Sequence, residues 1–129
     1  MGFFDDEKNV QEYIRMAEGY DGKALIDILK GHVHQDATVL ELGMGPGKDC
    51  DILRQFCRVT GSDNSAVFLE RYRKIHPDAD LLLLDAVHID TQRTFDCIYS
   101  NKVLHHLTTS ELQTSFQRQC DVLKEGGIM

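Results

Sequence analysis

The chain has 129 residues, of which 21 are acidic and 14 basic, giving a formal net charge of −7. This length suits one domain rather than two. The acidic balance argues against a protein that binds nucleic acid without regard to sequence, because such binding depends on neutralising phosphates with Lys and Arg.

The amino terminus lacks the features of a targeting or membrane segment. The stretch "MGFFDDEKNVQ" has no basic region ahead of a long apolar core, as a secretory signal would have, and no apolar run approaches the length of a membrane span. The four cysteines show no CxxC spacing, so neither a zinc site nor a disulfide framework is indicated, and no histidine stands at metal-ligand spacing from a partner. We expect a cytoplasmic protein without a metal and without membrane attachment.

Two amphipathic helices are predicted before the first strand. In residues 9–20 and again in residues 24–29, apolar side chains recur at the spacing of one helical face, and Gly31 is placed to end the second helix. Tyr13 and Tyr20 could contact a ligand, although packing is the commoner role for such residues.

Strands and helices alternate from residue 38 onward. Short β-prone runs bounded by polar residues predict strands at 38–42, 58–63, 80–85 and 95–101. The run 80–85 is apolar at successive positions, as expected of a strand that is covered on both faces.

Three helices are predicted between and after these strands. The first follows Asp49, and the second is capped by Ser65 and cannot continue through Pro77. Thr108 and Glu111 form a capping-box signature for the last helix, which the glycine pair at 126–127 would end.

This alternation predicts a single α/β domain over residues 1–129, with N-terminal helices in 1–31 and a core in 38–129. The fold would be an open parallel sheet with helices on both faces. The closing "GGIM" stops where a fifth strand would start, so we expect the sheet to be incomplete at its C-terminal side. The strand at 95–101 would then form an open edge through which the chain could self-associate.

The loop "ELGMGPG" at 41–47 follows the first strand, at the edge of the sheet where ligands bind in such folds. Glycine at 43, 45 and 47 leaves the backbone open to close approach. A P-loop is excluded, because Leu42 stands at its first glycine position and Asp49 follows Lys48. A dinucleotide fingerprint would need its third glycine one place later, and the acidic neighbours disfavour a diphosphate. A cofactor that carries a sulfonium and an ammonium, such as S-adenosylmethionine, tolerates those neighbours.

The same stretch resembles the first motif of the class I S-adenosylmethionine-dependent methyltransferases. Later landmarks follow in the order typical of that family: "GSD" at 61–63, "LLLLDA" at 81–86, "FDCIYSNKVLHHL" at 95–107 and "VLKEGG" at 122–127. The resemblance covers roughly residues 38–129 and implies a Rossmann-like fold.

The resemblance also implies roles for individual residues. Asp63 would accept hydrogen bonds from both ribose hydroxyls, Asp85 and Ala86 would read the adenine edge, and Glu41 would favour the cofactor's ammonium. Glu41 would also order the glycine loop. Structural alternatives stay open, since Asp63 could cap a helix, Asp85 could serve a turn and Glu41 could be a structural cap. The predicted cofactor-binding residues are Glu41, Gly43, Met44, Gly45, Gly47, Asp63, Asn64, Asp85, Ala86 and Asn101.

The implied reaction is in-line transfer of a methyl group to a small-molecule acceptor, with S-adenosylhomocysteine as product. His105 or His106 is the nearest candidate for a general base, the alternative being that one packs on the loop and the other faces solvent. "NKVL" departs from the Asn/Asp-Pro-Pro-aromatic motif of amino-methylating nucleic-acid enzymes, and "VLHHL" looks more like the small-molecule branch. A non-catalytic S-adenosylmethionine-binding regulatory or scaffolding module and a nicotinamide-dependent oxidoreductase are the alternatives.

Overall fold

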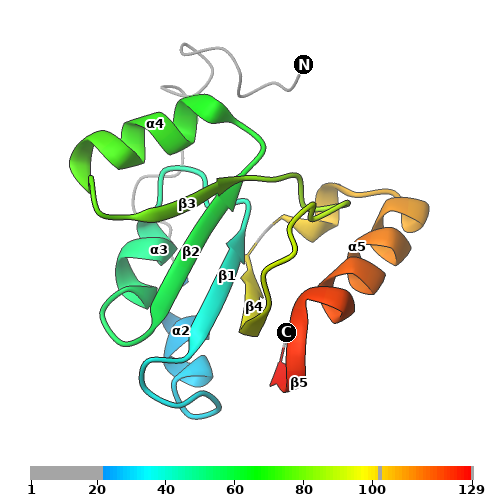
Figure 1. Ribbon diagram of the computed structural model, residues 1–129, viewed down its shortest axis with the longest axis horizontal. Coiled ribbons are helices and arrows are strands. Elements are labelled where there is room, and N and C mark those ends of the chain that lie inside the picture. The colour runs from blue at the N-terminus through cyan, green and yellow to red at the C-terminus, as the bar shows by residue number, and fades with distance from the viewer. Residues whose placement is uncertain (1–21, 102, 129) are drawn as a thin grey trace.

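The computed structural model describes residues 22–101 and 103–128, and the predicted helix at 9–20, with Tyr13 and Tyr20, lies outside them. Five parallel strands form one sheet in the order β3-β2-β1-β4-β5 (Figure 1). The elements of the described chain are α2 (Lys23–Leu29), β1 (Thr38–Leu42), α3 (Lys48–Leu53), β2 (Arg58–Asp63), α4 (Ala66–Ile75), β3 (Asp80–Leu83), β4 (Phe95–Ser100), the 3₁₀ helix η2 (Leu104–His106), α5 (Thr109–Val122) and β5 (Leu123–Ile128).

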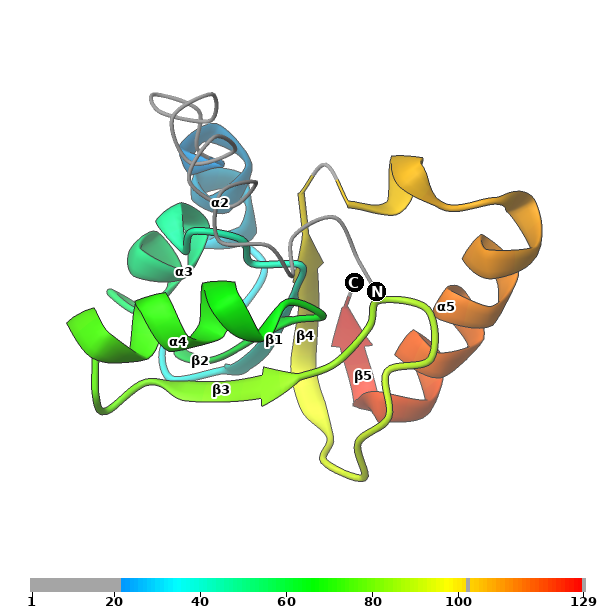
Figure 2. The same cartoon turned by 90° about the horizontal axis from the view of Figure 1, so that it is seen from above.

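Helices lie on both faces of this sheet, as the sequence predicts. Helices α2, α3 and α4 gather on one side and α5 lies on the other (Figure 2). No helix in the described residues is long and apolar enough to cross a membrane.

Strand β1 is the centre of the core. Successive side chains of a strand point to opposite faces, so a central strand is buried on both sides. Val39 packs in a cluster with Ile26 and Leu53 of the helices on one face. Leu40 packs with Val122 of α5 on the other face. The core is therefore continuous through β1 from one helical layer to the other.

Strand β3 departs from the prediction that it is covered on both faces. It lies at the edge of the sheet, and Leu83 is 63% exposed. Residues 84–94, which lead from β3 to β4, contain no helix, so the strict alternation of strand and helix is interrupted there. A run of leucines shows that a strand is apolar but does not show whether a helix follows to cover it.

The C-terminal end also corrects the prediction. Helix α5 ends at Val122, and the glycine pair lies within β5 instead of ending the helix. β5 pairs with β4 at Phe95 and Cys97, with a register shift between them, and Gly126 adopts a positive φ of 78°. The glycines therefore form an irregular strand, and the predicted open edge on β4 is wrong where β5 covers it.

The capping box at the start of α5 is confirmed. The Thr108 hydroxyl accepts from the Glu111 amide at 3.1 Å, and the Glu111 carboxylate accepts from the Thr108 amide at 2.9 Å. These two bonds satisfy amides that the first helical turn would otherwise leave unpaired.

We expect Thr108→Ala to lower the free energy of unfolding by about 1 kcal/mol, because the variant loses the cap of the helix that supports β4 and β5. Urea denaturation measures the difference. Thr114→Ala, in the exposed middle of the same helix, is the matched control and should change stability by less than about 0.5 kcal/mol. Equal stabilities of the two variants would show that the capping box contributes nothing measurable.

Candidate functional site

The carboxyl ends of the central strands bring the predicted site residues to one edge of the sheet. The pairing of β1 places Glu41 opposite Gly61 of β2 and Tyr99 of β4. Strand order reverses at β1, because β2 follows on one side and β4 on the other. Such a reversal is where open parallel sheets bind ligands.

The glycine loop between β1 and α3 is packed against the protein's own side chains. Gly43 and Gly47 adopt positive φ values of 63° and 94°. A Cβ at Gly43 would lie 2.6 Å from a methyl of Val103, and one at Gly47 would overlap the ring of Tyr72. At these two positions glycine is required by the turn and by packing, which adds to the predicted role of opening the backbone to a ligand.

Asp63 ties the loop to the end of β2. One of its carboxylate oxygens accepts from the Gly45 amide at 3.0 Å, and the other accepts from the Ser65 amide at 2.9 Å. Ser65 itself is the N-cap of α4, so the alternative role of Asp63 as that cap is wrong. Each oxygen of a carboxylate can accept more than one hydrogen bond, so holding the loop in this way is compatible with binding a sugar diol.

Asp49, on the first turn of α3, joins three separate segments of the chain. Its buried carboxylate accepts from the Gly22 amide, from the Tyr99 hydroxyl at 2.7 Å and from the Asn101 side-chain amide at 3.2 Å. The sequence indicates only that Asp49 is negatively charged, because no residue near it in the sequence predicts these three distant hydrogen-bond donors. We call this set of contacts the Asp49 junction. Because a carboxylate accepts hydrogen bonds, the contact is made by the NH₂ group of Asn101, and its carbonyl oxygen is not used in this bond.

Glu41 lies beside this junction at the end of β1. The residue is 3% exposed, and one of its carboxyl oxygens, Oε1, has no hydrogen-bond partner within residues 22–101 and 103–128. Burial first, and then the negative charges of Asp49, Asp63 and Asp51, raise the pKa of Glu41 well above its ordinary value. A buried carboxyl without a partner is costly, and a positively charged group would satisfy it. The site thus fits a cofactor with a cationic end.

Asp85 takes the turn role that was the alternative to adenine binding. One carboxylate oxygen accepts from the Val87 and His88 amides at 2.8 and 2.6 Å, and the other lies 3.2 Å from Nδ1 of His88. Burial alone would raise the pKa of Asp85, but the hydrogen bonds from His88 and Val87 outweigh it and lower that pKa. The Ala86 carbonyl accepts from Ser115 of α5, so the helix holds this turn in place. Reading of the adenine edge by Asp85 and Ala86 stays a prediction.

The remaining predicted residues are less closely joined to the site. The Met44 side chain packs in a core cluster with Cys50, Leu69 and Tyr72, so only its backbone is available to a ligand. Asn64 is exposed.

The two histidines lie in η2, after β4. His106 is exposed, and the side chain of His105 is outside the described part of the structure. A catalytic role for either one stays a prediction.

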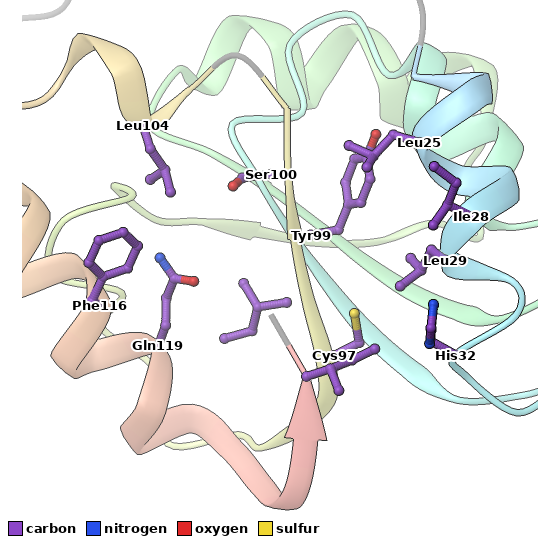
Figure 3. Close-up of a pocket in the computed structure, with 12 residues that line it drawn as sticks. Leu25, Ile28, Leu29, His32, Cys97, Tyr99, Ser100, Leu104, Phe116 and Gln119 are labelled. Atoms are coloured by element: carbon purple, nitrogen blue, oxygen red, sulfur yellow. The ribbon is translucent and has the colours of Figure 1, made fainter.

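A cavity of about 510 Å³ opens beside the end of β4 (Figure 3). Leu25 and Ile28 of α2 line one side, Phe116 of α5 lines another, and Tyr99 and Ser100 lie between them. Tyr99 therefore contacts Asp49 through its hydroxyl while its side chain also borders the cavity. This volume is in the range of small-molecule pockets.

Comparison with known proteins gives one family match. A family model described as a methyltransferase domain matches residues 39–127, which is more than half of the chain. No curated protein matches this sequence.

Solved structures resemble the fold over most of this chain. DesVI from Streptomyces venezuelae has a TM-score of 0.76 at 23% identity, and the match covers 95% of this chain and 56% of DesVI. A TehB-like SAM-dependent methyltransferase from Corynebacterium glutamicum has a TM-score of 0.79 at 20% identity, over 95% of this chain and 73% of its own. CalS10, an amino pentose methyltransferase from Micromonospora echinaspora, has a TM-score of 0.74 at 20% identity. The match covers 89% of this chain and 52% of CalS10. At these identities the likeness establishes the fold, and this chain spans little more than half the length of DesVI and CalS10.

We expect Gly22→Ala to lower the free energy of unfolding by about 1 to 3 kcal/mol, because the added Cβ would overlap Tyr99 and lie 2.6 Å from Asp49. Gly31→Ala is the matched control, since its Cβ would lie an ordinary 3.5 Å from the nearest described atom. Urea denaturation compares the two variants. A Gly22→Ala variant as stable as the unmodified chain would contradict the tight junction at Asp49.

We expect Glu41→Gln to stabilise the chain at neutral pH by about 1 kcal/mol or more, because burial disfavours the ionised carboxyl and glutamine needs no proton to be neutral. The pKa of this carboxyl is raised in the folded state, so the folded chain holds more protons than the unfolded chain between the two pKa values. Stability of the unmodified chain therefore falls as pH rises through that window, and the variant escapes the loss. Urea denaturation from acidic to neutral pH measures the difference. Glu70→Gln, an exposed control on α4, should show no such pH-dependent gain, and a constant effect of Glu41→Gln at all pH values would refute the expectation.

Proposed function

We propose that this chain, which belongs to the methyltransferase domain family, binds S-adenosylmethionine at the glycine loop and transfers its methyl group to a small-molecule acceptor. The buried carboxyl of Glu41, whose Oε1 has no hydrogen-bond partner among the described residues, carries the proposal. A cationic cofactor end would satisfy this group. The diphosphate of a nicotinamide cofactor would instead add negative charge next to Glu41, Asp49 and Asp63, which disfavours an oxidoreductase.

The chain's own residues act mainly by position. Asp63 accepts from the ribose hydroxyls while it holds the loop through Gly45, and the carbonyl oxygen of Asn101 accepts from the amino-acid end. When bound, the cofactor supplies a methyl group attached to a sulfonium sulfur. The rest of the cofactor is the leaving group and becomes a neutral thioether. Such a displacement depends on alignment and exclusion of water more than on a strong acid or base.

Two observations support a small-molecule acceptor. The cavity beside Tyr99 and Ser100 has a suitable volume and lies at the end of β4. CalS10, whose fold is similar, is an amino pentose methyltransferase. If the acceptor is a hydroxyl or a carbon acid, His106 or His105 is the base that we propose.

We further propose a cytoplasmic location. All four cysteines are free thiols in the structure, and Cys50, Cys57 and Cys97 are buried apolar residues. This use of cysteine suits a reducing compartment.

A non-catalytic S-adenosylmethionine-binding module is the second candidate. It is compatible with the same observations, because Glu41, Asp63 and the glycine loop concern the cofactor and not the acceptor. Transfer of labelled methyl groups to a panel of small metabolites separates the two candidates. Cofactor binding without any transfer would favour the module.

Binding is tested by calorimetric titration with S-adenosylmethionine, S-adenosylhomocysteine and NAD. We expect the first two to bind and NAD not to bind. Asp63→Ala should weaken S-adenosylmethionine binding by about 1 to 3 kcal/mol, because the ribose hydroxyls lose their acceptor.

Asp63 also supports the loop, so its variants need controls. Asp63→Asn keeps an acceptor oxygen and should lose less affinity than Asp63→Ala, and Asp78→Ala on the exposed surface should lose none. Circular dichroism verifies that each variant is folded. Unchanged affinity in folded Asp63→Ala would remove Asp63 from the ribose site, and binding of NAD alone would overturn the proposed function.

A further inference from the structure

The carboxyl of Glu41 lies in a strongly negative part of the site. Asp49 and Asp51 act on it from α3, and Asp63 acts on it from β2. All the charged groups known to act on Glu41 from the described residues are carboxylates. Nothing in this set compensates a negative charge on Glu41.

Two further titratable groups face Glu41 from neighbouring elements. They are the Cys50 thiol of α3 and the Tyr99 hydroxyl of β4. Burial raises the pKa of the Cys50 thiol to about 12, and burial together with the bond to Asp49 raises the pKa of Tyr99. Both groups are therefore neutral near neutral pH and supply no positive charge to Glu41.

The neighbouring acids differ from Glu41 in their hydrogen bonds. The carboxylate of Asp49 accepts three hydrogen bonds, and that of Asp63 accepts two from backbone amides. Donors of this kind stabilise the ionised form of a buried acid. Glu41 is 3% exposed, and its Oε1 has no donor among the described residues. The described polypeptide therefore offers this oxygen no stabilisation of a negative charge, which favours the protonated form of Glu41.

We propose that Glu41 holds a proton while the site is empty and releases it to solvent when a ligand with an ammonium group binds. This inference rests on the proposed function, since it concerns the same cofactor site. The exchange is balanced: one ammonium enters the site, the O–H bond of Glu41 breaks, and one proton passes to the buffer. The raised pKa of the Glu41 carboxyl in the empty chain agrees with this arrangement.

The exchange makes binding selective for the charged end of the ligand. S-adenosylmethionine and S-adenosylhomocysteine both carry the ammonium, whereas 5′-methylthioadenosine has the nucleoside and thioether without it. Affinity for the first two should rise with pH over the range in which Glu41 is protonated in the empty chain. Affinity for 5′-methylthioadenosine should not change with pH in that range.

The test is calorimetric titration of the full chain in buffers of different ionisation enthalpy, at a mildly acidic pH where an α-amino group stays protonated. We expect the binding enthalpy of S-adenosylmethionine and S-adenosylhomocysteine to vary with the buffer in proportion to about one released proton. 5′-Methylthioadenosine should show no release. Glu41→Gln should bind with little or no release, and Glu70→Gln, the matched exposed change, should behave like the unmodified chain.

Each contrary outcome has a distinct meaning. If both cofactor forms bind with the same enthalpy in every buffer, the proton exchange is wrong and the proposed function stands. Release with S-adenosylmethionine alone would overturn the assignment to the ammonium, because only that ligand carries a sulfonium. If neither form binds, the proposed function and this inference fall together. The buffer series on the unmodified chain needs no variant to fold.

An infrared measurement gives a second readout. The unmodified chain should show the C=O stretch of a protonated carboxyl that disappears when S-adenosylmethionine is added and is missing from Glu41→Gln. The same band in Glu41→Gln, or a band unaffected by the ligand, would contradict the proposal.

Discussion

The turn from β1 into α3 has no room for side chains on its inner surface, and the rest of the site depends on this constraint. Val103 packs against Gly43 and Tyr72 packs against Gly47, where φ is positive. Contacts from two other parts of the fold thus hold the loop before any ligand binds. The loop then presents the Gly45 amide to Asp63 and so joins the ends of β1 and β2.

The junction at Asp49 extends this order to the start of α2 and the end of β4. Its carboxylate receives donors from Gly22, Tyr99 and Asn101, which lie far apart in the sequence. The NH₂ group of Asn101 donates to Asp49, so this contact orients the Asn101 amide. Asp49 therefore positions a neighbouring side chain that we propose as a cofactor-binding residue.

The sequence predicts those features whose signal is local. The capping box at Thr108 and the cap at Ser65 depend on residues within one helical turn, and both form. The edge position of β3 and the inclusion of the glycine pair 126–127 in β5 depend on what packs beside them, which a short pattern does not contain. The Asp49 junction escaped prediction for the same reason, since its partners are brought together only by the finished sheet.

The acidic residues of the site differ in the hydrogen-bond donors that the fold provides to their carboxylates. Asp63 and Asp85 accept from backbone amides, which are fixed in direction once the chain has folded. Asp49 accepts from both backbone and side chains. Glu41 is 3% exposed, and its Oε1 has no donor among the described residues. Because the fold supports the first three charges, the cost of burying negative charge falls mainly on Glu41. The proposed cationic end of the cofactor would act at this position, where the described polypeptide provides the least compensation.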